Sequence, residues 1–193
     1  MRIGQSLREN NELNRFRPTS ARLKVDGGKI SEVETIIARE NEFAFNADGL
    51  LETKNQNWET ILPPDQRTPR KVMIEAADNY FNMFAEEPTV SVPFAKVCDR
   101  WENGTQTTKG GAFAGGPEMP AHDCSPKGLV INNHGPRRFL VDTEKGIVAA
   151  YVLFAGGLPD CHMFKMVNGR VDLILAVVGA GSKTMGWPDE PAE

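Results

Sequence analysis

Two stretches of alternating hydrophobic and polar residues repeat each other along the chain. Residues 23–37 align without a gap on residues 164–178. In each copy a strand leads into a glycine-containing turn, Asp26-Gly27-Gly28 in the first and Val167-Asn168-Gly169 in the second. Glycine and asparagine tolerate the positive φ that two-residue hairpin turns require, and β-branched residues follow each turn. Each stretch is therefore predicted to be a β-hairpin, and the pair indicates duplication of a whole unit.

The two copies differ in ways that indicate different surroundings. Glu32 and Glu34 of the first copy align with Leu173 and Leu175 of the second. Because alternate residues of a strand share one face, this face is predicted to be solvent-exposed in the first hairpin and buried in the second. We expect the second hairpin to lie in the centre of a core and the first to lie at a sheet edge or an interface.

An amphipathic helix is predicted between the hairpins. Thr68 is expected to be its N-cap, and Pro69 its first residue, where a missing N–H costs nothing. Apolar residues then recur at helical spacing and form one broad face that we expect to pack against a sheet. These residues are Val72, Met73, Ala76, Ala77, Tyr80, Phe81 and Phe84.

Further strands are indicated after this helix. The expected elements are a strand region over 92–106 with a turn at Asn103-Gly104, a loop over 109–128, and strands over 138–142, 147–154, 162–167 and 170–178. A helix followed by a meander of antiparallel strands predicts the α+β class, with the helix covering one face of a curved sheet. Residues 41–67 are expected to form an ordered linker and residues 179–193 a flexible tail.

Composition narrows the range of partners. The chain has 193 residues, of which 25% are charged and 40% hydrophobic, as is typical of a soluble globular protein. No apolar run approaches the ~20 residues that span a bilayer, so we predict no membrane association. The net charge of −4 offers no basic surface for phosphates, so nucleic-acid binding is not expected. A small molecule is the expected ligand.

The N-terminal residues bear on localisation. Met1-Arg2-Ile3-Gly4-Gln5 leads into polar sequence without the apolar core of a signal peptide. This predicts a cytoplasmic chain. A secreted or periplasmic chain is the alternative if the true N-terminus lies upstream.

Three cysteines, Cys98, Cys124 and Cys161, fit neither a zinc knuckle nor a Cys-x-x-Cys motif. Cys98 and Cys124 flank the loop that is rich in glycine and proline. A disulfide between them would stabilise the fold by roughly 3 kcal/mol in an oxidising compartment. The alternative is three buried thiols.

The densest group of reactive side chains lies around residue 100. On a strand, Cys98, Arg100 and Glu102 share one face, and Asp99 and Trp101 share the other. An inward Arg100–Glu102 pair would position an anion and move a proton, because a low dielectric shifts pKa values. The alternative is an exposed ion pair worth ~0–1 kcal/mol.

His162 aligns with Ala21 of the first copy, so the hairpin does not need an imidazole there. A histidine near the mouth of a cavity acts as a general acid or base around neutral pH, whereas a lone histidine is otherwise structural. Tyr80 would donate a hydrogen bond into such a cavity or lie in the core with its hydroxyl at the rim.

The run His134-Gly135-Pro136-Arg137-Arg138 precedes a strand and offers paired guanidinium groups for a carboxylate or phenolate; the alternative is a solvated run. The chain has no Gly-x-Gly-x-x-Gly, Walker, Gly-x-Ser-x-Gly or His-Glu-x-x-His motif. Cofactor-free chemistry is therefore the class that we expect, without a metal.

The order of these elements resembles a known superfamily. The chain has a helix with an inward Tyr80-Phe81, a polar strand ending in Glu102-Asn103-Gly104, the runs Arg137–Asp142 and Gly146–Phe154, and a closing His162-x-Phe164-Lys165 hairpin. It is similar to the SnoaL-like branch of the nuclear transport factor 2-like superfamily, and more closely to fungal and bacterial proteins with two such units in tandem.

This resemblance covers residues 68–178 as one unit and residues 5–40 as the last strands of a preceding one. It implies a cone-shaped curved antiparallel sheet wrapped by helices around an apolar cavity, preceded by a β-hairpin remnant of a second copy. Residues 1–40 would then belong to an incomplete first unit. The chain is in that case a fragment, or another chain supplies the missing half.

Members of this superfamily include ketosteroid isomerases, scytalone dehydratase and polyketide cyclases, which use carboxylates, histidine and tyrosine for cofactor-free proton transfer. By resemblance we expect a lyase or isomerase for a small aromatic or carbonyl-containing molecule. The residues themselves suggest Glu102 or His162 as the base, and Arg100, Arg138 or Tyr80 as the group that stabilises the developing oxyanion. The expected substrate-binding residues are Tyr80, Trp101, His134, Arg138, Tyr151 and Phe164. The alternative is a non-catalytic ligand-binding or dimerisation module. A homo-oligomer, or pairing with the missing N-terminal unit, is expected.

Overall fold

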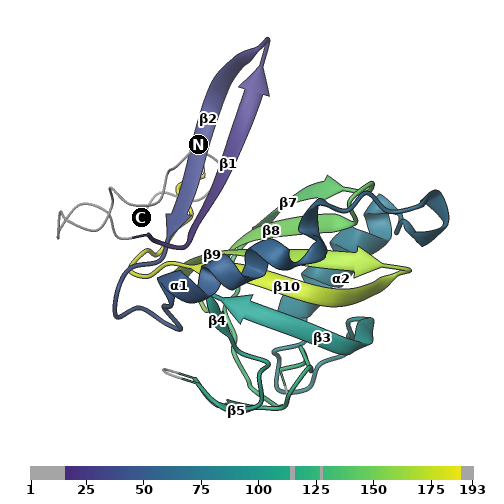
Figure 1. The fold of residues 1–193 in the computed structure, drawn as a ribbon. Helices are drawn as coiled ribbons and strands as arrows, with labels where there is room; N and C mark the ends of the chain where they lie inside the picture. Colours follow the sequence, from purple (N-terminus) through teal and green to yellow (C-terminus); the bar gives the residue numbers. More distant parts are fainter. Residues whose placement is uncertain (1–15, 114–115, 127, 188–193) are drawn as a thin grey trace, which may run out of the picture.

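The fold is α+β, as the helical pattern followed by a series of strand patterns predicts (Figure 1). The computed structural model describes residues 16–113, 116–126 and 128–187; the N-terminal part of the predicted first unit, residues 1–15, lies outside this range. The main sheet is curved and unclosed and has six strands in the order β4-β3-β10-β9-β8-β7. β10 and β3 run parallel, and the other neighbours are antiparallel. The strands are β3 (Phe94–Glu102), β4 (Thr105–Gln106), β7 (Arg137–Asp142), β8 (Ile147–Phe154), β9 (Leu158–Val167) and β10 (Arg170–Val178).

One helix covers the principal face of this sheet. Helix α2 (Arg70–Asn82) packs against β7 and β8 and buries Met73, Ala76, Ala77, Tyr80 and Phe81. These side chains share a core cluster with the inward residues of β8, β9 and β10. The predicted helix face is therefore confirmed except at Val72, which is 40% exposed.

The predicted N-cap is wrong. Pro69 occupies the N-cap position of α2, without a capping side chain. The hydroxyl oxygen of Thr68 instead accepts a hydrogen bond from the backbone N–H of Gly169, at 3.1 Å. Thr68 is 2% exposed, so its hydroxyl satisfies the turn of the second hairpin rather than the start of the helix.

The segment over residues 41–67, expected to be a linker, lies against the other side of the sheet. It forms α1 (Ala47–Leu50) and three short 3₁₀ helices, η1 (Leu51–Asn55), η2 (Asn57–Glu59) and η3 (Pro64–Gln66). Trp58 packs with Trp101 of β3 and Leu173 of β10. Since Ile174, the neighbour of Leu173, belongs to the core under α2, this second cluster lies on the opposite sheet face.

The first hairpin stands away from the body as a separate two-stranded sheet (Figure 1). It consists of β1 (Thr19–Asp26) and β2 (Lys29–Ile37). The expectation that its charged face is solvent-exposed holds for Lys24 and Glu32, whose side chains are 49% and 38% exposed, but is wrong for Glu34, which is turned inward and 14% exposed. The apolar face is exposed as well. The physical reason is pairing: Arg22 contacts both glutamates, and Lys24 provides a second cation for Glu32.

The C-terminal segment, expected to be a flexible tail, makes defined contacts in its described part. Trp187 is 6% exposed and packs with Ile36 of β2 and Tyr151 of β8. Its indole N–H donates a hydrogen bond to the carboxylate of Glu34. Among the described residues, no helix is long and apolar enough to cross a membrane.

Two glycines with similar backbone angles give a matched test of the turns. Gly104 (φ +91°) and Gly169 (φ +75°) both have the left-handed conformation, but a Cβ on Gly104 would lie 1.9 Å from the carbonyl oxygen of Asn46, whereas one on Gly169 meets nothing within 4 Å. Gly169→Ala should lower the free energy of unfolding by about 1 kcal/mol, the cost of the left-handed conformation. Gly104→Ala should cost about 2–3 kcal/mol, because overpacking is added. Urea denaturation measures both, and equal losses would contradict the close approach.

Candidate functional site

A cavity of about 400 Å³ opens beside the C-terminal half of α2. Most of its wall is apolar and comes from α2, from β8 and β9, and from loop residues near 43, at 113, between 117 and 126, and between 129 and 131. The apolar lining residues are Phe43, Phe84, Phe113, Pro117, Met119, Pro126, Leu129, Ile131, Phe154, Ala155, Leu158 and Val178. Against this wall stand the polar residues Tyr80, Arg100, Glu102, Asp160 and His162. The structure therefore brings the predicted Tyr80, Arg100, Glu102 and His162 to one cavity.

Asp160 and His162 form a buried pair at the start of β9. Residues two apart on a strand share a face, and His162 Nδ1 lies 2.9 Å from Asp160 Oδ1. The side chain of His162 is 2% exposed and that of Asp160 is 1% exposed. His162 Nε2 and Asp160 Oδ2 have no hydrogen-bond partner among the described residues. The pair thus keeps one nitrogen and one oxygen unused in a water-poor site, which is costly unless a ligand uses them.

Arg100 forms the centre of a second polar group on β3. Its terminal nitrogen Nη1 donates to the Tyr80 hydroxyl at 2.9 Å and to the carbonyl oxygen of Cys124 at 3.3 Å. Its Nε donates to the Thr107 hydroxyl at 2.9 Å and lies 3.2 Å from Glu102 Oε2. The other terminal nitrogen has no hydrogen-bond partner within the described part of the chain. Arg100 can therefore hold an anionic oxygen while remaining anchored.

The charge states of this group follow from burial and neighbours. Burial raises the pKa of Tyr80 to about 12, although Arg100 opposes the shift. Burial by itself would lower the pKa of Arg100, but Tyr80 and Glu102 outweigh that effect and raise it. Tyr80 thus remains a protonated hydroxyl at neutral pH and Arg100 a cation. Because the Tyr80 oxygen accepts from Arg100, its own O–H is left to donate.

A disulfide ties the loop wall of the cavity to β3. Cys98 and Cys124 are joined, and the backbone N–H of Cys98 donates to the carbonyl oxygen of His122 at 2.9 Å. The same cross-link brings the Cys124 carbonyl to Arg100. Cys161 is a buried free thiol on the opposite side of β9 from His162, and burial raises its pKa to about 12.

The other predicted binding residues do not line this cavity. Trp101 and Tyr151 belong to clusters on the other side of the sheet, because they alternate with inward residues along their strands. The Arg138 guanidinium lies over the Trp187 ring at 4.4 Å. The His134 ring packs on Phe154, with centroids 4.6 Å apart, and Phe164 is fully buried behind Tyr80.

Asp160 is the important residue that the sequence analysis did not identify. The predicted strand began at His162, whereas β9 begins at Leu158 and so includes Asp160. The signal was present as Asp160-Cys161-His162, since a carboxylate two residues from a histidine on a strand shares its face. The loop residues of the wall, such as Met119 and Ile131, gave no periodic signal.

Asp160 should also make the stability of the fold depend on pH. Burial raises the pKa of its carboxyl, with His162 opposing and Glu102 adding to the shift. The folded chain then keeps this proton to higher pH than the unfolded chain, so the carboxyl reduces stability as pH rises through that interval. Asparagine avoids this cost. In urea denaturation, the stability of Asp160→Asn relative to the natural chain should therefore increase as the pH rises above about 4, the ordinary pKa of an aspartate. A difference that shrinks as pH rises would contradict this.

Comparisons with known proteins give one match. The family model described as a domain of unknown function, DUF8021, matches residues 66–178. This span contains α2, all strands of the main sheet and every polar residue of the cavity. No curated protein and no solved structure matches the chain significantly. Among the described residues, no group of three histidine, cysteine or acidic side chains could hold a metal ion.

Proposed function

The chain belongs to the family of the domain of unknown function DUF8021, and we propose that it catalyses proton transfer as a lyase or isomerase. The substrate is a small, mainly apolar molecule with a carbonyl group. The observation that carries this proposal is the buried Asp160–His162 pair, whose unused Nε2 belongs to a ring that lines the apolar cavity.

His162 is the general base in this proposal. With Asp160 ionised, its carboxylate can only accept, so His162 Nδ1 carries the proton and Nε2 presents a lone pair. Asp160 fixes this tautomer and stabilises the imidazolium that forms. Such orientation of an imidazole by a buried carboxylate is a general device for proton abstraction.

Tyr80 and Arg100 bind the oxygen on which charge develops. The Tyr80 O–H and the unused terminal nitrogen of Arg100 are donors held by their own hydrogen bonds before a ligand arrives. Preorganised donors of this kind stabilise an enolate more than its parent carbonyl. Glu102 is then the counter-ion that positions Arg100 rather than the base.

These groups alone account for the proton and the electron pair that move in the proposed reaction. His162 takes a proton from the carbon next to the carbonyl, and the C–H electron pair becomes the C=C bond of an enolate. In an isomerase the imidazolium returns the proton to a different carbon. In a lyase the enolate expels a β-hydroxyl group, which leaves as water with the proton from His162.

The apolar wall sets the substrate class. Phe84, Phe113 and Phe154 offer ring faces and edges for an aromatic ligand. A wall made only of such residues would favour a non-catalytic binding module, which is the second candidate. The buried, unused polar atoms of Asp160 and His162 favour the enzyme, because a binding site for an apolar molecule gains nothing from them.

We also propose that residues 66–178 have the SnoaL-like cone fold. The α+β class, the curved unclosed sheet, and a helix that covers the cavity-bearing face support this assignment.

Deuterium exchange tests the proposed activity without knowledge of the natural substrate. The chain is incubated in D₂O with propiophenone and β-hydroxypropiophenone, and NMR follows deuterium at the carbon next to the carbonyl and loss of water. We expect exchange that His162→Gln slows strongly and that the control His134→Gln retains, since His134 lies outside the cavity lining. Saturable ketone binding without exchange would overturn the enzyme proposal in favour of the binding module.

A further inference from the structure

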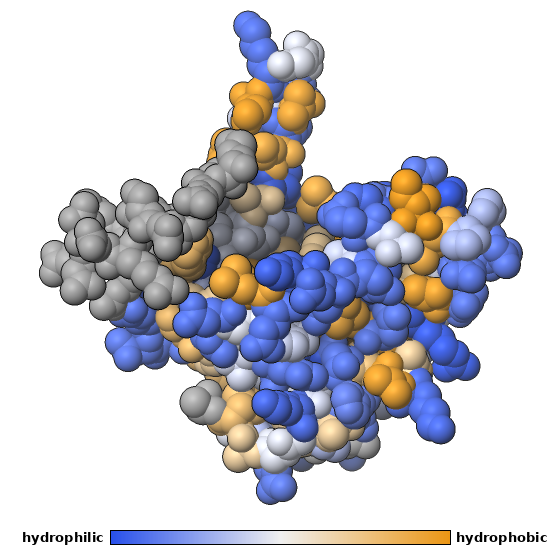
Figure 2. All heavy atoms as spheres, viewed as in Figure 1, coloured by the Kyte–Doolittle hydropathy of each residue, from blue (hydrophilic) through white to orange (hydrophobic). Residues whose placement is uncertain are grey.

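The projecting hairpin presents an apolar face that nothing in the described chain covers. Leu23, Val25, Ile30 and Val33 are 52%, 59%, 59% and 65% exposed. Figure 2 shows hydrophobic residues along this hairpin, where it rises from a largely polar surface. An isolated two-stranded ribbon is marginally stable, and a contiguous exposed apolar face marks an interaction site.

The second hairpin shows how such a face is buried in this protein. The two hairpins have the same register: Leu23 pairs with Val33 as Phe164 pairs with Ile174, and both ladders shift by one residue at the aligned position. The four exposed residues of the first hairpin correspond to Phe164, Met166, Val171 and Ile174, all 0% exposed. Those four lie in the core cluster with α2, and Phe164 packs on Tyr80 of that helix.

The first hairpin lacks the polar pair of the second. The positions of Asp160 and His162 are held by Thr19 and Ala21 in the alignment. At the positions that align with buried residues of the second hairpin, the exposed face therefore has no candidate base and no charged residue. Its chemistry suits docking of an apolar surface rather than a second catalytic site.

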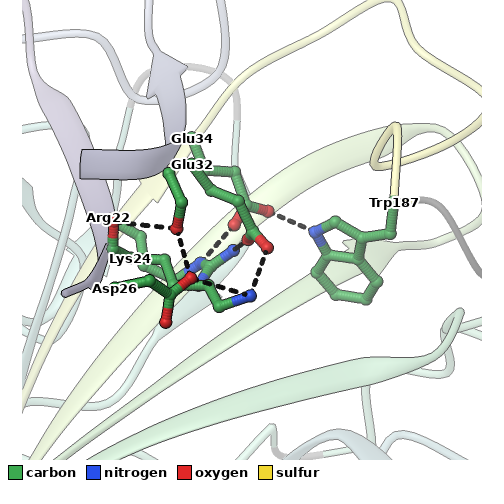
Figure 3. Close-up of polar contacts among 7 residues, drawn as sticks. Arg22, Lys24, Asp26, Glu32, Glu34 and Trp187 are labelled. Carbon is green, nitrogen blue, oxygen red and sulfur yellow. Dashed lines mark hydrogen bonds and ion pairs between the residues drawn. The ribbon is translucent and has the colours of Figure 1, made fainter. Parts of the chain in front are cut away.

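The charged residues of the hairpin restrict the surface chemistry of a partner further. Five charged residues of the hairpin lie on the opposite face and pair with each other, as Figure 3 shows: Arg22 with Glu32 and Glu34, and Lys24 with Asp26 and Glu32. Trp187 adds a hydrogen bond to Glu34. These pairs leave the apolar face without a charge to match, so a complementary partner must present an uncharged surface.

We propose that this face docks an amphipathic α-helix of a partner polypeptide, through a helix face of small and aromatic residues like that of α2. The reason for a helix is the internal precedent: the matching residues of β9 and β10 share one core cluster with α2, and the rings of Tyr80 and Phe81 lie 5.1 Å and 6.4 Å from that of Phe164. A helix that packs on such a sheet face buries its residues at positions i, i+3 and i+4.

The test uses the full chain with labelled methyl groups and an acetylated peptide of residues 68–84. We expect saturable binding, with chemical-shift changes confined to the methyls of Leu23, Val25, Ile30 and Val33. Val33→Lys should weaken binding at least tenfold, and the control Leu140→Lys, at a surface leucine 41% exposed, should leave it unchanged. A peptide carrying Ala77→Glu should not bind.

Other outcomes overturn the proposal. Absence of binding, shifts located elsewhere, or binding that Val33→Lys leaves unchanged would each do so. A dimer of the free chain that Val33→Lys dissociates, measured by light scattering, would identify a second copy as the occupant. Flotation with phosphatidylcholine vesicles that Val33→Lys abolishes would identify a lipid surface.

Discussion

His162→Gln is expected to lower the rate of deuterium exchange into a bound ketone by about 10³-fold, within the range that general bases contribute. The imidazole is the group that takes the proton, and glutamine fills a similar space without a basic nitrogen. Ligand affinity should change less than about threefold, since Tyr80 and Arg100 still hold the carbonyl oxygen. Exchange rates by NMR and ligand affinity by fluorescence titration separate the two effects.

Asp160→Asn is the companion variant for this prediction. Asparagine can hydrogen-bond to Nδ1 but cannot neutralise an imidazolium, so exchange should fall while the ring stays in place. A fall in affinity equal to the fall in rate for both variants would assign the pair to binding. A full rate with His162→Gln would mean that another group, such as Glu102, takes the proton.

Local patterns predicted most of the fold because its elements have strong local causes. The glycine turns at Gly28 and Gly169 and the helical spacing of Met73 to Phe81 depend only on backbone angles and side-chain period. The strand bounds 147–154 and 170–178 were predicted correctly for the same reason. The N-cap failed because Thr68 serves a residue that is distant in the sequence, Gly169.

Only those residues of the site that follow the two-residue alternation of a strand were predicted from the sequence. Alternation along β3 placed Arg100 and Glu102 on one face, and the structure has them in one cavity. Asp160 was missed because Pro159 interrupts the pattern at the start of β9, where strand bounds are least certain from sequence. The cavity wall at Met119, Pro126 and Ile131 belongs to a loop region that a disulfide holds to β3, and these residues follow no period.

Arg100 links the proposed chemistry to stability, and Arg100→Ala should lower the free energy of unfolding by about 3–5 kcal/mol. The side chain is 7% exposed, and its loss would leave the Glu102 carboxylate, 13% exposed, without its cation. The Tyr80, Thr107 and Cys124 acceptors would lose their donor as well. Urea denaturation at neutral pH measures the loss, and the exposed Arg170→Ala is the control, with an expected change below about 0.5 kcal/mol.

A double variant distinguishes the ion pair from simple packing. Arg100→Met with Glu102→Gln removes both charges and keeps much of the volume, so most of the lost stability should return, because replacing a buried pair costs less than breaking it. Deuterium exchange should not return, since the cation that holds the developing enolate oxygen is gone. A double variant as unstable as Arg100→Ala would show that the hydrogen bonds to Tyr80 and the disulfide loop, rather than the buried charge, make Arg100 necessary for folding.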